Sequence, residues 1–294
     1  MKLNIQNYLK KKFPYEKMIN KNSDYERWFF ENQISDAING YSIIKKFLKK
    51  NDKILEIGGG MHMLSNYLAY LKYDITSIEP GGFRKEIDSV RRKILKFKEP
   101  NLKIKNNYLE NISNEYQNKI DFAYSINVLE HTKNIKKHLS SVNQILKDEK
   151  SICHIRCPNY SFPFESHFYV FFIPTLPLFT FKILHEKKLI KKYGKRLYFS
   201  TLNSLNFGCT YFKVKNLNQN LFFLNTLDDI FLRIEKDKVF KKRILSNKII
   251  SFTYSLIKNF GLKKLISFIY PNLLSPYMVM NLKKNCENVF RNKK

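Results

Sequence analysis

Two carboxylates stand where the sequence predicts that β-strands end. Glu56 lies in an apolar, β-prone run that leads directly into glycines at residues 58–60. Glu79 closes an alternating run at residues 73–78, about 20 residues after the first of those glycines. A carboxylate only accepts hydrogen bonds, so at the end of such a strand it suits the two donor hydroxyls of a ribose. These residues predict a site for an adenosine-containing ligand.

A strand, a tight turn and a helix must position these groups. Residues 53–57 predict the strand, and a helical pattern begins at Met63, directly after the glycines. Glycine permits backbone conformations closed to other residues and lets a ligand approach the main chain. A dinucleotide fingerprint would require glycine at position 63, where the chain has methionine, so the spacing excludes that ligand.

The pattern Glu56-x-Gly58-x-Gly60 resembles motif I of the class I S-adenosylmethionine-dependent methyltransferases. In that family the loop passes under the methionine and ribose of the cofactor, and the residue that corresponds to Glu79 accepts both ribose hydroxyls. Many members have a third glycine where this chain has His62. The tip of the loop therefore departs from the fuller pattern.

A third stretch, residues 119–131, extends the resemblance. Asp121 opens an apolar strand that ends at residues 125–127, which lie next to the methionine of the cofactor in related enzymes. Residues 127–131, Asn-Val-Leu-Glu-His, resemble the x-V-L-E-H signature of one branch of the family. The resemblance covers roughly residues 40 to 160.

The resemblance implies S-adenosylmethionine as the cofactor. Related enzymes often bind the adenine amino group with an acidic residue after the third strand, and the register here is ambiguous between Tyr108 and Glu110. We retain Glu110, with a solvated loop acid as the alternative. The implied cofactor-binding residues are Glu56, Gly58, Gly59, Gly60, His62, Glu79, Glu110, Ser125 and Asn127.

Strands that alternate with helices predict an α/β fold with right-handed crossovers. By resemblance we expect a Rossmann-like, doubly wound sheet of about seven strands, mostly parallel, whose antiparallel last strand lies near residues 276–282. Ser35 is the expected cap of a helix that runs to Leu48. The predicted domains are an N-terminal helical cover (1–50), the S-adenosylmethionine-binding core (51–160), a substrate-specificity and lid insertion of basic and apolar helices (161–275), and the last strand with a basic tail (276–294).

Methyl transfer to a hydroxyl requires alignment of the acceptor and removal of its proton. His131 belongs to the signature, and His167 follows the fifth predicted strand in a loop at the rim where substrates of open α/β sheets bind. These two imidazoles are the candidate bases, with Glu165 as a partner. A purely structural role is the alternative for each histidine.

Charge and cysteine content restrict the class of protein. The net charge is +28, and lysine, asparagine, isoleucine, phenylalanine and tyrosine are abundant, which is typical of an AT-rich genome. The charge alone therefore does not indicate a specific nucleic-acid partner. Four cysteines without framework spacing indicate reduced thiols in a cytoplasmic protein, and we expect no metal site.

Two segments combine apolar and basic residues. Residues 169–184 are nearly all apolar and are followed by a basic run at 186–197; a second pairing occupies 240–270. The first apolar stretch is too short and too interrupted by proline to span a bilayer, which leaves a lid, a buried helical hairpin or a membrane-dipping element. An anionic membrane surface, at the inner face of the membrane, is one interpretation of both segments, and a solvated lysine face over an ordinary core is the other.

Together these features predict an S-adenosylmethionine-dependent O-methyltransferase for a small-molecule or glycan acceptor, such as a lipid-linked sugar of surface polysaccharide synthesis. There are two alternatives. One is an RNA methyltransferase, which the net charge would favour, and the other is a non-catalytic protein that retains the fold. The sequence contains no Asn-Pro-Pro-Tyr tetrad of amino methylation, and intact Glu56 and Glu79 argue against a non-catalytic role.

If the positive charge is compositional, the chain binds RNA weakly, and the affinity falls steeply with salt because binding is phosphate neutralisation alone. Fluorescence anisotropy with two unrelated RNA sequences across a salt series measures this. Tight binding at physiological salt that distinguishes the two sequences would contradict the prediction.

Overall fold

The computed structural model describes residues 3–20, 23–82, 85–165, 168, 170–173, 176–217, 220–224, 227–246, 248–262, 264–266 and 275–284. The chain divides into two compact units. The first unit comprises residues 1–125, 141–154 and 283–294, and the second comprises residues 126–140 and 155–282.

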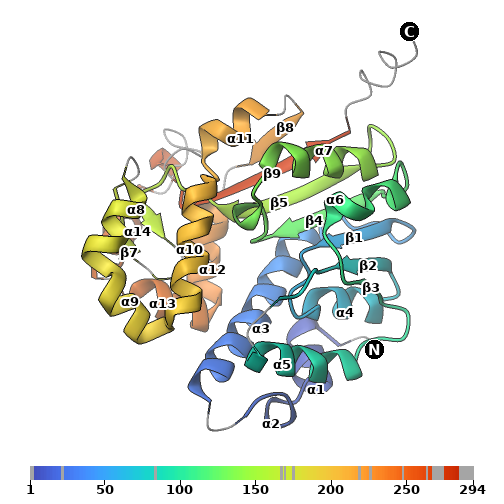
Figure 1. Ribbon diagram of the computed structural model, residues 1–294, viewed down its shortest axis with the longest axis horizontal. Helices are drawn as coiled ribbons and strands as arrows, with labels where there is room; N and C mark the ends of the chain where they lie inside the picture. Colours follow the sequence, from blue (N-terminus) through green and yellow to red (C-terminus); the bar gives the residue numbers. More distant parts are fainter. Residues whose placement is uncertain are drawn as a thin grey trace. The chain divides into compact units, whose positions relative to one another are not determined.

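Seven strands form the main sheet, in the order β3-β2-β1-β4-β5-β9-β8 (Figure 1). The pairs β1–β2, β1–β4 and β2–β3 are parallel, whereas β8 and β9 are antiparallel to each other. The predicted Rossmann-like fold is therefore confirmed. The strands are β1 (Lys53–Ile57), β2 (Asp74–Ile78), β3 (Lys103–Lys105), β4 (Phe122–Ile126), β5 (Ile152–Pro158), β8 (Leu221–Leu224) and β9 (Tyr277–Lys283).

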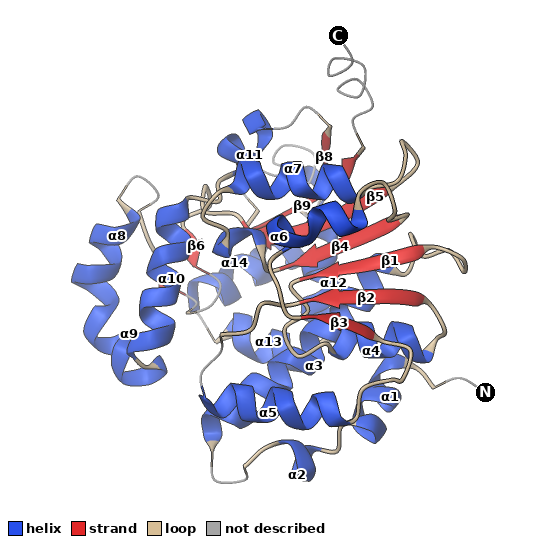
Figure 2. Ribbon diagram, turned by 45° about the vertical axis from the view of Figure 1, so that its right-hand side comes forward, coloured by secondary structure: helices blue, strands red, loops and turns tan. Residues whose placement is uncertain are grey.

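The strand order places a switch point between β1 and β4. From β1 the chain steps outward to β2 and then β3, and it returns to β4 on the other side of β1. Because parallel crossovers are right-handed, α4 (Met63–Tyr70) and α5 (Lys85–Lys96) cover one face, and α6 (Leu109–Ile112) covers the opposite face. Figure 2 shows this arrangement around the strands. Ligands of such sheets bind beyond the carboxyl ends of the strands at the switch point.

A long N-terminal helix corrects one prediction. We expected a helix capped by Ser35, but α3 (Asp24–Ile44) begins earlier and contains Ser35 in its interior. The physical reason is a stronger cap at Ser23, whose Oγ accepts a hydrogen bond from the Glu26 backbone N–H at 3.2 Å. The Glu26 carboxylate in turn accepts one from the Asn20 N–H at 2.7 Å. The spacing is that of a capping box, but the Glu26 carboxylate binds the N–H of Asn20, whereas the Ser23 N–H donates to the Asn20 carbonyl.

The remaining elements of the first unit are short. Two of them precede α3 and one lies between β3 and β4. The fourth, α7, has residues in both units. They are α1 (Ile5–Lys12), α2 (Tyr15–Met18), η1 (Ser113–Tyr116) and α7 (Ile135–Ile145).

The second unit is largely helical. The apolar stretch predicted as a lid, a hairpin or a membrane-dipping element forms β7, α8 and the π-helical turn η3. In the part of the chain that the structure describes, no helix is both long enough and apolar enough to span a bilayer. The elements are η2 (Leu129–His131), β6 (Phe164–Glu165), β7 (Val170–Phe171), α8 (Pro177–Thr180), η3 (Phe181–His185), α9 (Glu186–Tyr193), α10 (Lys195–Phe207), α11 (Tyr211–Leu217), α12 (Leu227–Lys236), α13 (Lys238–Leu245) and α14 (Lys248–Asn259).

Candidate cofactor site and candidate base

The glycine loop turns sharply at the end of β1. Gly58 and Gly60 have φ angles of 75° and 54°, which glycine adopts without the cost that a Cβ would impose. The N–H groups of Gly58 and Gly59 both donate to the Ile78 carbonyl, at 2.8 and 3.0 Å. The loop is therefore fastened to the end of the neighbouring strand β2.

Gly59 is required for a different reason. A Cβ at this position would lie closer than 3.0 Å to side-chain atoms of Glu56, Ser77 and His62. These three side chains pack directly beneath the loop, so the middle glycine is needed for packing.

The Glu79 carboxylate closes the loop from the end of β2. Its Oε2 accepts a hydrogen bond from the Gly60 N–H and its Oε1 accepts one from the Gly81 N–H, each at 2.9 Å. Each carboxylate oxygen can accept more than one hydrogen bond. Burial raises the pKa of Glu79, while the two N–H groups and the nearby Arg91 oppose that rise. The predicted ribose-binding group is thus fixed in place by the loop itself.

A buried polar network lies under the loop. Its centre is Glu56, whose Oε1 accepts a hydrogen bond from the Tyr124 hydroxyl at 3.0 Å. Ser77 donates its hydroxyl to Oε2 of the same carboxylate. The three side chains come from adjacent strands of the sheet, β1, β4 and β2. Such a network is stabilising only because its members satisfy one another.

His62 joins the network where related proteins have a third glycine. Its backbone keeps the left-handed conformation that favours glycine, with φ 57°, and its side chain is fully buried. Nδ1 lies 2.7 Å from the Ser77 Oγ, and Nε2 lies 3.1 Å from the Arg91 guanidinium. Arginine can only donate, so Nε2 accepts and the ring proton is on Nδ1. The hydrogen bonds therefore run in one direction, from Arg91 and His62 through Ser77 to Glu56.

The end of β4 offers polar atoms that fit a bound cofactor. Among the described residues, the Ser125 Oγ and the Asn127 Oδ1 are buried and make no hydrogen bond. Asn127 has a φ angle of 57°, a conformation that asparagine tolerates better than most residues. Buried polar groups without a protein partner indicate a ligand or water that satisfies them. The residues present fit S-adenosylmethionine at the position that the sequence predicts.

Glu110 and His167 are two further predicted site residues. Glu110 lies half-buried in the first turn of α6, while Tyr108 is exposed, and the role of Glu110 toward adenine stays a prediction. His167 lies outside the described residues.

The candidate base His131 lies in the second unit at the end of η2. Its Nδ1 is 2.8 Å from the Ser204 Oγ on α10, and the Ser204 hydroxyl donates to the Ser200 carbonyl at 3.2 Å. The Ser204 hydroxyl therefore holds the imidazole at Nδ1. The Nε2 atom lies 3.8 Å from Oε1 of the buried Glu130 carboxylate. Both ring nitrogens thus have a neighbour that fixes the orientation of the ring, and the role of His131 as the base stays a prediction.

Glu165, the predicted partner of the base, lies in β6, and its role toward the base stays a prediction. Its side chain is fully buried in β6, and its Oε2 accepts a hydrogen bond from the Phe168 N–H at 2.7 Å. The Tyr160 hydroxyl is also buried and has no hydrogen-bond partner among the described residues. Burial, reinforced by the negative charges of Glu165 and Glu130, raises the pKa of Tyr160 far above its ordinary value, so the phenol keeps its proton.

Sequence reasoning missed several residues of the site. Ser77, Tyr124 and Arg91 complete the buried network, Ser204 orients His131, and Gln33 of α3 lies beside Gly60. Ser77 and Tyr124 occupy alternating strand positions that carry no motif. Ser204 is separated from His131 by 73 residues, so no local pattern pairs them.

The fold and the site together are those of a Rossmann-like α/β protein of the methyltransferase type. A sequence profile of the methyltransferase domain family matches residues 26–206, and the chain therefore belongs to that family. The resemblance to class I S-adenosylmethionine-dependent methyltransferases is confirmed. Two uncharacterised proteins from Mycobacterium tuberculosis strains are 38% identical to the chain over 126 residues, which are 39% of this chain and 39% of each relative.

Solved structures share the fold. The phosphoethanolamine N-methyltransferase 2 of Haemonchus contortus, in complex with S-adenosyl-L-methionine, is 12% identical and has a TM-score of 0.50. The match covers 96% of this chain and 60% of that protein. An S-adenosylmethionine-dependent methyltransferase from Mesorhizobium loti is 12% identical over 45% of this chain and 59% of its own, with a TM-score of 0.36. The likeness to the Haemonchus contortus structure shows the fold alone.

Glu79→Ala is expected to weaken binding of S-adenosylmethionine by about 1–3 kcal/mol, because it removes charge-assisted hydrogen bonds to the ribose and to the loop. Isothermal titration calorimetry measures the change. Glu115→Ala removes a carboxylate of the same unit that is paired at the surface with Lys105, and this control should bind like wild type. A folded wild-type chain that binds no cofactor would contradict the assignment of the site.

The buried network also predicts an unusual pH dependence of stability. Burial raises the pKa of Glu56 from 4.5 to about 7 and lowers that of His62 from 6.5 to about 3. Above pH 4.5 the folded chain holds an extra proton on Glu56, so the free energy of unfolding falls as the pH rises toward 7. Below pH 6.5 the unfolded chain holds an extra proton on His62, so that free energy rises with pH. The two effects oppose each other between pH 4.5 and 6.5.

Glu56→Gln removes the titration of Glu56, which lowers the free energy of unfolding as the pH rises, and leaves that of His62. The free energy of unfolding of the variant is therefore expected to rise, relative to wild type, by about 1–3 kcal/mol between pH 4.5 and 6.5. Urea unfolding at a series of pH values measures it, with Glu115→Gln as the control for loss of an exposed carboxylate. Parallel profiles for Glu56→Gln and wild type would show that Glu56 titrates normally.

Proposed function

We propose that the chain transfers a methyl group from S-adenosylmethionine to a hydroxyl of a small molecule or glycan, with His131 as the general base. The observation that carries this proposal is the 2.8 Å contact between the His131 Nδ1 and the Ser204 hydroxyl, which fixes the orientation of the imidazole at the end of η2. An amine that is already deprotonated does not require an oriented base, whereas a hydroxyl gains from one.

When bound, S-adenosylmethionine supplies an electrophilic methyl on a sulfonium. Glu79 would hold the ribose, the glycine loop would lie beneath the cofactor, and Ser125 and Asn127 would bind at its methionine. His131 Nε2 would take the proton of the acceptor hydroxyl as the oxygen receives the methyl group. The sulfonium supplies this methyl as an electrophile and would keep the electron pair of the carbon–sulfur bond. The buried Glu130 carboxylate, 3.8 Å from Nε2, favours the imidazolium that results.

The acceptor is proposed to bind in the second unit, which contains buried polar groups that have no predicted role in binding the cofactor. The buried Tyr160 hydroxyl and the Glu165 carboxylate are suited to hydroxyl groups of a sugar, since a protonated phenol donates and a carboxylate accepts. A lipid-linked sugar at the inner face of the membrane is the specific acceptor class that we propose. The cytoplasmic location and the peripheral membrane contact belong to the same proposal.

His131→Ala is expected to lower turnover by about 10²–10⁴-fold, the usual size of general-base catalysis, and to leave cofactor affinity unchanged. Turnover is measured by transfer of radiolabelled methyl to a panel of hydroxylated sugars and sugar-lipids, and cofactor affinity by calorimetry. Ser204→Ala should reduce turnover less, because the imidazole remains but is no longer held at Nδ1. The matched control is His185→Ala, which removes a histidine whose Nε2 contacts the Phe171 carbonyl at 3.0 Å.

The pH profile gives a second readout. The wild-type rate should fall on the acidic side as His131 becomes protonated, and His131→Ala should lose that limb. Wild-type turnover by His131→Ala, under conditions where chemistry limits the rate, would eliminate His131 as the base.

A further inference from the structure

The helical segment α8–η3–α9 exposes an unusual row of large apolar side chains. Ile183 and Leu184 are 61% and 64% exposed, and Phe179 is 57% exposed. Leu176 and Leu178 extend the row toward the start of α8. Large apolar side chains that gather on one segment of a surface usually mark a binding surface.

The opposite side of the same segment is firmly anchored. Phe181 is fully buried, with its ring centroid 6.1 Å from that of Phe172 and 6.2 Å from that of Phe168. Thr180 accepts a hydrogen bond from the Ile173 N–H at 3.2 Å and donates to the Leu176 carbonyl at 2.9 Å. The exposed row is therefore presented by a segment with its own buried contacts, and it is not a consequence of missing packing.

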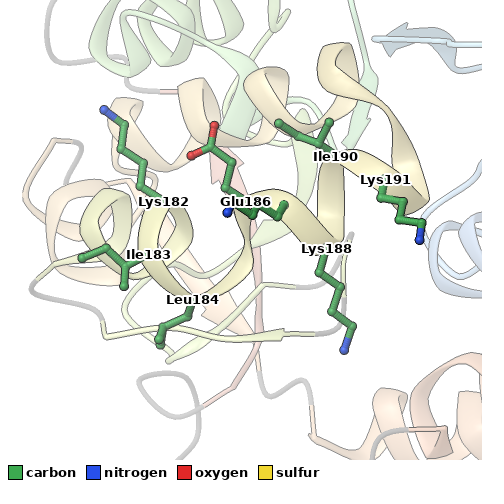
Figure 3. A pocket seen from close by; sticks show the side chains of 8 residues that line it. Lys182, Ile183, Leu184, Glu186, Lys188, Ile190 and Lys191 are labelled. Atoms are coloured by element: carbon green, nitrogen blue, oxygen red, sulfur yellow. The ribbon is translucent and has the colours of Figure 1, made fainter.

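Lysines adjoin the apolar row. A surface hollow of about 750 Å³ is lined by Lys182, Ile183, Leu184, Glu186, Lys187, Lys188, Ile190 and Lys191. Leu184 and Lys188, one helical turn apart, point to the same side (Figure 3). Four lysines and one glutamate line this hollow, so its net charge is positive. Apolar side chains next to a cationic hollow match the two layers of an anionic lipid surface, the acyl boundary and the headgroup phosphates.

We propose that this α8–α9 surface, formed by the five apolar residues from Leu176 to Leu184 and the four lysines of the hollow, binds an anionic phospholipid bilayer. Phe179, Ile183 and Leu184 enter the acyl boundary, and the lysines bind the phosphates of the headgroups. This inference assigns the membrane contact of the proposed function to a particular surface. It rests on the proposed function only for the reason why the protein would bind a membrane. Vesicle binding can be measured without any acceptor or cofactor.

The test is co-sedimentation of the full chain with phosphatidylcholine vesicles that contain about 30% phosphatidylglycerol, compared with pure phosphatidylcholine. The wild-type chain should bind the anionic vesicles and bind the neutral ones far less. Lys187→Gln/Lys188→Gln/Lys191→Gln should lower the partition coefficient by about fivefold for each lysine, the factor equivalent to about 1 kcal/mol. Ile183→Ser/Leu184→Ser should lower it at least tenfold, because two apolar anchors are lost.

Matched controls separate this surface from the general positive charge of the chain. Lys133→Gln/Lys136→Gln/Lys137→Gln removes the same charge from other exposed lysines, and Phe97→Ser/Phe212→Ser removes two other exposed apolar side chains. Both controls should bind vesicles nearly as wild type does. Equal losses in the control and surface variants, or no loss in the surface variants, would overturn the proposal.

Calorimetry with S-adenosylmethionine checks that the surface variants are folded. Methyl transfer to a soluble acceptor should be unchanged in them, so a failure of vesicle binding is distinguishable from a failure of the proposed reaction. Preserved vesicle binding with no methyl transfer by the wild-type chain would overturn the proposed function and leave the α8–α9 surface standing.

Discussion

The cofactor side of this protein depends on the buried hydrogen bonds that lead from Arg91 through His62 and Ser77 to Glu56. A carboxylate removed from water is costly unless donors satisfy it, and here Ser77 and Tyr124 supply them from the two neighbouring strands. The network therefore ties together three parallel strands at the edge where the cofactor loop turns. The absence of a side chain at Gly59 follows from this packing.

His62 illustrates how a departure from a family pattern can be accommodated. A third glycine would adopt the left-handed conformation without strain, whereas a histidine there costs conformational energy. The cost is offset because the buried imidazole bridges Arg91 and the Ser77–Glu56 pair. A feature that looks like a weakened motif in the sequence is thus an additional hydrogen-bonded support in the structure.

The second unit has a different physical organisation. His131 is oriented by a serine of α10, Glu165 and Tyr160 are buried polar groups, and the α8–α9 surface leaves apolar side chains exposed. The groups predicted to bind the cofactor lie in the first unit and at the end of β4, and the groups proposed to bind the acceptor lie in the second unit.

The local sequence was sufficient for the strand ends, the glycine turn and Glu79, because each is marked by periodicity or by residue types that the turn itself requires. The alternation of strands and helices likewise predicted a parallel α/β sheet, and the resemblance to the methyltransferases implied its antiparallel last strand. Tertiary structure decided the rest. The start of α3 depended on competition between two serines, and only Ser23 has a glutamate placed to bond the chain before it. The inward turn of His62 required Arg91, 29 residues away, and the orientation of the His131 imidazole required Ser204, 73 residues away. Such pairings join residues from different elements, and their hydrogen bonds exist only after the elements have packed.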